Sequence, residues 1–263
     1  MKIDATRYRQ FHANPEEFRI AQLIGLVPDL PKHSPMTFGR HRGLAFHYLN
    51  EGAEVPEGLD DRAEAIARQM HEANIADPVM KQTRLLKTEE EFCIPIEGTP
   101  HFMVGKIDNE VDRGDGPFIL DFKTTKQRTV ADLRHYLNEL RQNPQVDFYL
   151  IASGLTKLVY RVISRNPKPR KGAPEIEIRE IEVARTPREL AYFKRGVAMT
   201  CDVIEFLTEK YGIEKPWPRP PKVGGDPDLY PFGPLFMRHL VKGAEYAGFK
   251  LREEHLEVLK VSG

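Results

Sequence analysis

The segment 117-PFILDFKTTK-126 combines an apolar strand pattern with charged residues. Its first four residues form an apolar run typical of a buried strand, and the run continues into Asp121 and Lys123 without a break in the strand pattern. Residues two apart share one face of a strand, so the carboxylate and the ammonium point the same way. Because charge is costly to remove from water, the pair is either an ordinary surface ion pair or part of a binding site.

The preceding residues predict the other half of a β-hairpin. Residues 101–111 (HFMVGKIDNEV) have the pattern of a strand, and residues 112–116 (DRGDG) form a turn sequence. With the turn centred on Gly114 and Asp115, Asp108 lies directly across from Asp121. Opposed residues have Cβ atoms roughly 4.5–5.5 Å apart, so two carboxylates there need a bound cation or a raised pKa. A register slip of one residue would separate them.

Helices and further strands are expected around this hairpin. Helices are expected over 4–26, interrupted at Pro15, from Thr37 past His47, and over 60–76, 129–142 and 143–155. Strands are expected over 89–96, 157–165 and 174–185. Thr186 and Glu189 form a capping box that opens a long helix, followed by a Pro/Gly-rich stretch and a polar helical tail.

This order of elements predicts an α/β fold: a restriction-endonuclease-like core with a central mixed β-sheet flanked by helices, an N-terminal helical segment and a C-terminal helical extension. We expect one domain over residues 1–263. It consists of a helical part (1–80), a catalytic core (85–165), and a strand, long helix and Pro-rich extension (166–263).

Composition excludes several classes of protein. The chain of 263 residues is 40% hydrophobic and 30% charged, and no apolar run reaches the length of a membrane span. Its start lacks the pattern of a secretory signal, so we expect a cytoplasmic protein without a membrane partner. Lys plus Arg equals Asp plus Glu at 39 each, so affinity for nucleic acid must be local. Cys93 and Cys201 are too few for a disulfide framework and are expected in the core.

Five short motifs together resemble the PD-(D/E)XK nuclease superfamily, specifically its RecB-type branch of phage recombination and CRISPR adaptation nucleases. They occur in the order GLAFH (43–47), an acidic strand from Glu89, GKID (105–108), DFKT (121–124) and QVDFY (145–149). Residues 6–20 resemble the family's N-terminal helix. Iron–sulfur members carry four cysteines, whereas this chain has two in all, so no iron–sulfur cluster is expected.

The resemblance implies a metal-dependent nuclease. Asp108, Asp121, the backbone carbonyl of Phe122 and His47 would hold Mg²⁺ or Mn²⁺, which activates water and neutralises charge on the phosphodiester. Lys123 would orient that water, and Glu89 or, as the alternative, Glu91 would hold a second metal or polarise water. His47 and the glutamates also have a structural alternative. His47 would then be a helix histidine with a hydrogen bond in the core, and the glutamates of TEEE would be a solvated run of charge.

Substrate contacts are expected from two segments. Gln145 and Tyr149 are four residues apart on one helix face, and the resemblance places them beside Lys123 or the substrate. The basic loop could contact DNA phosphates without reading bases, or form a charged tip that binds nothing. Its candidate residues are Arg165, Lys168, Arg170 and Lys171.

The first hypothesis for function is a deoxyribonuclease, as an exonuclease of recombination, repair or phage replication. Its partner would be the DNA backbone, with a recombination or replication protein as a second partner. A structure-specific endonuclease, a non-catalytic DNA-binding subunit and an enzyme for another phosphoester remain alternatives, since one fold supports all of these.

Overall fold

The structure, a computed structural model, describes residues 1–28, 34–126, 130–166, 175–214, 217 and 249–251. The chain forms two compact units. One consists of Met1, residues 3–30 and residues 196–263. The other consists of Lys2 and residues 31–195, and it contains all the candidate site residues.

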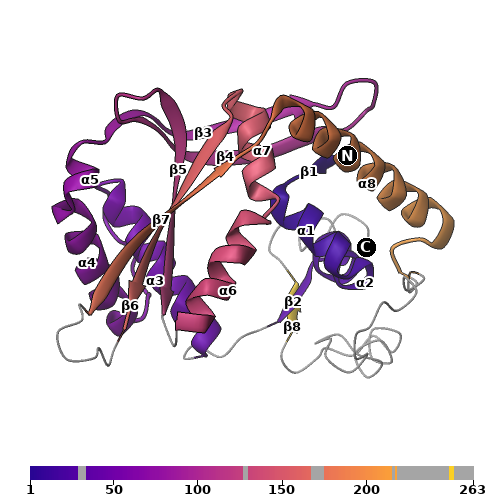
Figure 1. The fold of residues 1–263 in the computed structure, drawn as a ribbon. Helices are drawn as coiled ribbons and strands as arrows, with labels where there is room; N and C mark the ends of the chain where they lie inside the picture. The colour runs from indigo at the N-terminus through magenta and orange to yellow at the C-terminus, as the bar shows by residue number, and fades with distance from the viewer. Residues whose placement is uncertain (29–33, 127–129, 167–174, 215–216, 218–248, 252–263) are drawn as a thin grey trace. The chain divides into compact units, whose positions relative to one another are not determined.

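The larger unit is built on a mixed β-sheet (Figure 1). Its strands follow in the order β3-β4-β5-β6-β7, with β5 and β6 parallel and the other neighbours antiparallel. The predicted meander β3-β4-β5 and the mixed sheet are confirmed. The strands are β3 (Arg84–Pro95), β4 (Phe102–Asp112), β5 (Pro117–Lys126), β6 (Lys157–Arg165) and β7 (Ile176–Ala184).

The β4–β5 hairpin has the predicted register, because Glu110 pairs with Ile119 and Asp112 pairs with Pro117. The paired ladder, however, covers only these residues and the pair between them. Asp108 and Asp121 lie two steps beyond its last pair. In contrast, β3 and β4 stay paired as far as Pro95 and Phe102. The β3–β4 hairpin, residues 84–112, is called the arm below.

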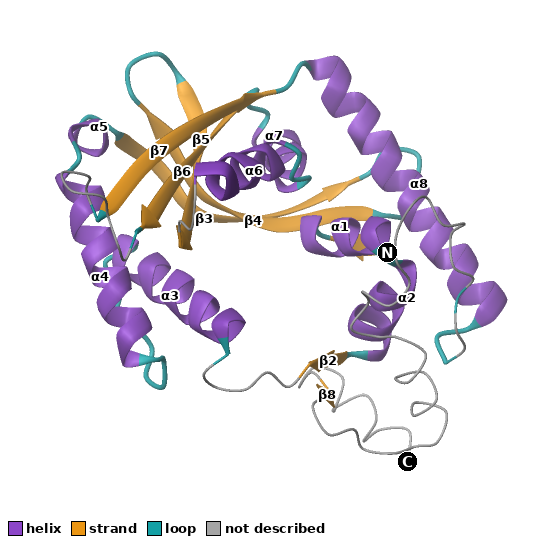
Figure 2. Ribbon diagram, turned by 60° about the horizontal axis from the view of Figure 1, so that its bottom comes forward, coloured by secondary structure: helices purple, strands orange, loops and turns teal. Residues whose placement is uncertain are grey.

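Helices cover both faces of this sheet (Figure 2). On one face lie α3 (Pro35–Asn50) and α4 (Asp61–Ala76), followed by the short α5 (Pro78–Lys81); on the other lie α6 (Val130–Arg141) and α7 (Gln145–Ser153). Phe46 of α3 and Met70 of α4 belong to one buried hydrophobic cluster with Ile163 of β6. Gly154, with φ of +71°, ends α7, because its left-handed conformation favours glycine.

The helix α8 (Pro187–Tyr211) starts with the predicted capping box. The backbone nitrogen of Glu189 donates to Thr186 Oγ1 at 3.2 Å, and the backbone nitrogen of Thr186 donates to Glu189 Oε2 at 2.7 Å. Two of the donors at the helix start are therefore satisfied.

The chain begins with the short strand β1 (Lys2–Ile3). The smaller unit then contains α1 (Ala5–Ala13), α2 (Pro15–Phe18), a π-helix (Arg19–Ile24) and β2 (Leu26–Pro28). Pro15 opens α2, as its fixed φ allows, so the predicted interruption is confirmed. The Pro/Gly-rich stretch and the tail lie largely outside the described residues. Where the tail is described, the helix prediction is wrong: Phe249–Leu251 form the strand β8, which pairs with β2, because pairing to a distant strand overrides local propensity.

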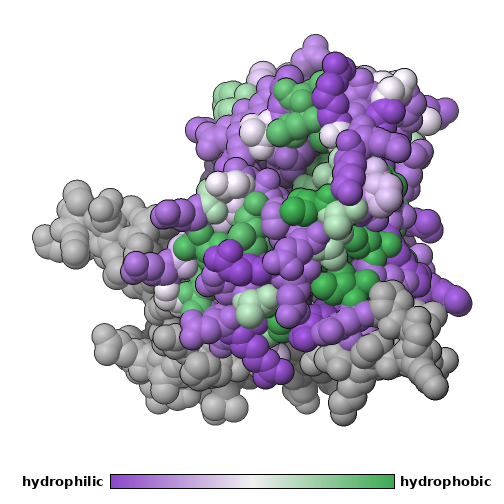
Figure 3. Space-filling view, turned by 90° about the vertical axis from the view of Figure 1, so that its left-hand side faces the viewer, coloured by the Kyte–Doolittle hydropathy of each residue, from purple (hydrophilic) through white to green (hydrophobic). Residues whose placement is uncertain are grey.

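The surface, the helices and the cysteines bear on the composition argument in different ways. The face on the α4 and α5 side is largely hydrophilic, with separate hydrophobic areas (Figure 3). Among the described helices, none is long and apolar enough to span a membrane. Cys201 is buried as expected, but the prediction for Cys93 is wrong: it is exposed, because β3 is covered by β4 on one edge only.

Candidate functional site

A pocket of about 270 Å³ gathers the residues that were widely separated in the sequence. The helix α3 contributes one wall, the arm contributes another, and the last part of β5 closes the pocket. Its charged and ring-bearing residues are Phe46, His47, Glu51, Glu89, Asp108, Phe122 and Lys123.

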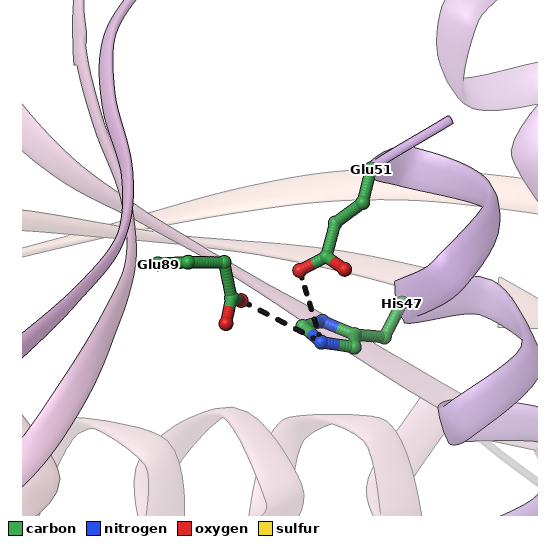
Figure 4. A group of neighbouring side chains, drawn as sticks. All are labelled: His47, Glu51 and Glu89. Carbon is green, nitrogen blue, oxygen red and sulfur yellow. Dashed lines mark ion pairs between the residues drawn. The ribbon is translucent and has the colours of Figure 1, made fainter. Parts of the chain in front are cut away.

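His47, Glu51 and Glu89 meet at one side of this pocket (Figure 4). His47 Nε2 lies 3.0 Å from Glu51 Oε1 and 3.5 Å from Glu89 Oε1. One ligand atom from each of the three residues lies within 4.8 Å of the others. An imidazole and two carboxylates are donors that suit Mn²⁺ and also allow Mg²⁺.

The backbone of Glu89 is unusual, with φ of +54°, and it is the one described residue other than glycine with positive φ. Such a conformation costs on the order of 1–3 kcal/mol and requires support from its surroundings. Here the side chain forms ion pairs with His47 and with Lys106. These ion pairs support the strained backbone of Glu89, whose carboxylate enters the pocket.

The structure distinguishes the two glutamates that the sequence left open. Glu89 lines the pocket, whereas Glu91 is exposed and lies across from Lys106 on β4. Of the two, only Glu89 has the position needed to bind a cation with His47.

Asp121 and Lys123 form the pair expected from the opening stretch. Lys123 Nζ lies 2.8 Å from Oδ1 and 3.0 Å from Oδ2 of Asp121, and it donates a hydrogen bond to Oδ2. Oδ1 is therefore paired with the ammonium, and beyond this ion pair it has no hydrogen-bond partner among the described residues. The Asp121 side chain is 0% exposed. A buried carboxylate oxygen with no further donor keeps a lone pair for a cation.

Burial dominates the acid–base properties of both aspartates. It raises the pKa of Asp121 to about 6, against the pull of Lys123 and with a further rise from the charge of Asp108. Burial also raises the pKa of Asp108, although Lys123 and His47 act in the opposite direction. Both carboxyls are therefore poorly stabilised as anions without a cation, which is the electrostatic situation that a divalent metal relieves.

Gln145 and Tyr149 lie where their spacing predicted. Gln145 Oε1 accepts a hydrogen bond from Lys123 Nζ at 3.1 Å, and its Nε2 donates to the Tyr149 hydroxyl at 2.7 Å. Burial, together with the charges of Asp108 and Asp121, raises the pKa of Tyr149, so its hydroxyl stays protonated. Gln145 thus contacts the ammonium of Lys123, and Tyr149 holds Gln145.

The basic loop is only partly described. Arg165 forms an ion pair with Glu175, with 2.6 Å between Nη2 and Oε1. Lys168, Arg170 and Lys171 lie outside the described residues. The predicted phosphate contacts of this loop stay predictions.

Sequence reasoning missed Glu51, the residue that ends α3. Its position four residues after His47 was the available signal, since residues four apart share a helix face. The donor set as a whole fits a divalent cation: carboxylates of Glu51, Glu89 and Asp108 around one pocket, and the buried Oδ1 of Asp121 beside it.

Comparison with known proteins gives a family match. A sequence model of the PD-(D/E)XK nuclease superfamily matches residues 3–205. A search of curated proteins finds no match to this sequence.

Solved structures similar to this chain include three exonucleases at low sequence identity. A putative exonuclease from Eubacterium rectale is 15% identical, with a TM-score of 0.46 over 78% of this chain and 80% of that one. A phage-related exonuclease from Haemophilus somnus 129PT is 13% identical, with a TM-score of 0.43 over 80% and 96%. The alkaline exonuclease LHK-Exo from Laribacter hongkongensis is 12% identical, with a TM-score of 0.36 over 80% and 92%.

Proposed function

The chain belongs to the PD-(D/E)XK nuclease superfamily, and we propose that it is a Mg²⁺- or Mn²⁺-dependent deoxyribonuclease that degrades DNA from its ends. The observation that carries this proposal is the pocket shared by α3, the arm and β5. It brings a histidine, three carboxylates and a lysine together, with a buried aspartate beside them.

The proposed roles combine the resemblance with the lining of the pocket. His47, Asp108, Asp121 and the carbonyl of Phe122 would hold one cation, and Glu89 with Glu51, which meet His47 in the same pocket, would add ligands to it, hold a second cation or polarise water. When bound, the cation lowers the pKa of water and screens the charge that develops on the phosphate.

Lys123 acts at the reacting phosphate. Its ammonium is held by Gln145 and Asp121, and it orients the attacking water or donates to a phosphate oxygen. A phosphodiester repels the carboxylates of the pocket, so a cation and Lys123 together are needed before the substrate can approach. The reaction is hydrolysis without a covalent enzyme intermediate.

Contacts to DNA are proposed along the phosphate backbone, without base reading. The sequence contains no recognised module for base edges, which favours end-dependent degradation in recombination, repair or phage replication over cleavage at specific sequences. A replication or recombination protein in the cytoplasm is the proposed second partner.

One digestion experiment tests the function. Linear duplex DNA labelled at the 5′ or the 3′ end, a covalently closed circle and an RNA of equal length are incubated with Mg²⁺ or Mn²⁺. We expect stepwise loss of the linear DNA, an intact circle and intact RNA. A chelator should stop the reaction, and a Lys123→Ala preparation serves as the control for contaminating nucleases.

Each other outcome favours a specific alternative. Cutting of the circle would indicate an endonuclease, and cleavage of RNA alone would indicate a different substrate. DNA binding with no cleavage by either metal would indicate a non-catalytic subunit and would contradict the proposal.

A further inference from the structure

The two groups of site residues are held apart by a short strand ladder. Glu89 and Asp108 lie on the arm, whereas Asp121 and Lys123 lie on β5. Backbone pairing between β4 and β5 ends at Glu110, so it does not fix the distance from the arm's carboxylates to those of β5. The arm also buries side chains of its own, such as Met103 and Ile107. At least one contact between the arm and the helices beside β5 is needed to help set this distance.

Phe92 makes that contact on the arm. It is paired with Gly105 across the β3–β4 ladder, and its ring lies over the glycine. A Cβ atom at position 105 would lie 2.7 Å from Cζ of the ring, which is too close for any real side chain. An aromatic side chain that covers a cross-strand glycine gives the strand pair packing that glycine itself lacks.

The same ring reaches the helix α7. The Phe92 and Tyr149 rings meet edge to face, with centroids 6.3 Å apart and planes at 87°. This is a favourable geometry for an aromatic pair. Tyr149 is 8% exposed, so its ring has a fixed position against the arm.

From Tyr149 the contacts continue to Lys123. The tyrosine hydroxyl accepts a hydrogen bond from Gln145 Nε2, which leaves Gln145 Oε1 facing the ammonium of Lys123. A flipped amide would present its NH₂ group to a cation, so this orientation has an electrostatic reason.

We propose that Phe92 is a positioning residue of this nuclease: seated on Gly105 and against Tyr149, it holds Glu89 and Asp108 at the distance from Asp121 and Lys123 that joint metal binding requires. The expected effect of Phe92 on DNA cleavage rests on the proposed function. The expected effect of Phe92 on Mn²⁺ binding does not. Gly105 is the second requirement, because a Cβ atom at this position would meet the tip of the ring and displace it.

The test is a double-mutant cycle with Phe92→Ala, Gly105→Ala and the double variant. We expect each single variant to lower kcat/KM on linear DNA by about 10- to 100-fold and to raise the half-saturating Mn²⁺ concentration by a similar factor, as is usual when the support of metal ligands is lost. The double variant should be no worse than either single variant, since all three break one contact.

Two further variants separate positioning from general stability. Phe92→Leu keeps an apolar side chain at this place without adding an atom at the tip of the ring, and its kcat/KM and half-saturating Mn²⁺ concentration should lie between those of Phe92→Ala and the wild type, by the same reasoning on retained support. Phe102→Ala removes an aromatic ring that is 37% exposed on the same arm, and it should leave the Mn²⁺ dependence unchanged.

The second readout is the rise in melting temperature on addition of Mn²⁺, which does not depend on activity. The rise should shrink in Phe92→Ala and Gly105→Ala but persist in Phe102→Ala. Lower melting temperatures with an unchanged Mn²⁺ dependence would show that Phe92 has a structural role only.

The outcomes for the wild type distinguish the two proposals. A wild type that binds Mn²⁺ through Phe92-dependent geometry but does not cleave DNA would overturn the proposed function and support this inference. Cleavage of DNA with equal Mn²⁺ dependence in Phe92→Ala and Phe102→Ala would overturn this inference alone. A wild type with neither a Mn²⁺ effect nor cleavage would overturn both.

Discussion

Replacing Asp121 by asparagine should make the metal-free protein more stable at neutral pH, although it removes a charged group from an ion pair. The carboxyl is fully buried, and beyond its ion pair with Lys123 its Oδ1 has no hydrogen-bond partner among the described residues. Asparagine has nearly the same shape and no charge to desolvate. Asp121 therefore lowers the stability of the metal-free protein, which is a common property of residues that serve a binding site.

The magnitude follows from the raised pKa of Asp121. Burial raises it from the ordinary value of 3.8 to about 6. A group whose pKa is raised on folding contributes stability when it is protonated, and that contribution is lost as pH rises from the unfolded towards the folded pKa. A shift of about two pH units corresponds to about 3 kcal/mol, lost between about pH 4 and pH 6. The Asp121→Asn variant has no such loss.

Thermal melts in chelator at pH 4, 5, 6 and 7 measure the effect. Between pH 4 and pH 7, the melting temperature of the variant should gain on that of the wild type by roughly 6–12 °C, the shift expected for about 3 kcal/mol in a protein of this size. Asp108 and all other titrating groups are common to both proteins, so their effects largely cancel.

Added Mn²⁺ should reverse the order of stability. The wild type gains stability from the bound cation, while Asp121→Asn loses a carboxylate ligand and gains little. Melting profiles that run parallel from pH 4 to pH 7 would refute the reasoning, because they would mean that Asp121 is charged at no cost in the folded protein.

Four further predictions follow. Lys123→Ala should reduce DNA cleavage at least about 100-fold, because it removes a group that stabilises charge in the transition state. The far-UV circular dichroism spectrum should be unchanged. Cleavage at the wild-type rate would exclude that role for Lys123. Glu51→Gln should raise the half-saturating Mn²⁺ concentration about tenfold or more without changing the preference for DNA ends, since it lies 3.0 Å from His47. Thr186→Ala should cost about 1 kcal/mol in urea denaturation through loss of the α8 cap, with DNA cleavage unaffected. Purified protein should show no visible absorbance from an iron–sulfur cluster, and a stoichiometric iron content would contradict the cysteine argument.

The β4–β5 hairpin and its register could be predicted from local sequence patterns. Asp108 and Asp121 could be placed on neighbouring strands because the alternation of apolar residues and the DRGDG turn are local features. The capping box at Thr186 and the break at Pro15 were readable for the same reason.

Only the tertiary structure decided which acidic residues meet His47. Glu89 and Glu91 have the same chemistry and lie on the same strand, and the choice of Glu89 depends on its positive φ and on the approach of α3 to the arm. Glu51 enters the site for the same non-local reason. Phe92 contacts both Gly105 and Tyr149. The contact with Tyr149 depends on how α7 packs against the arm, which lies some fifty residues earlier in the chain. Local pattern specifies elements and register, whereas contacts between elements depend on packing across the whole fold.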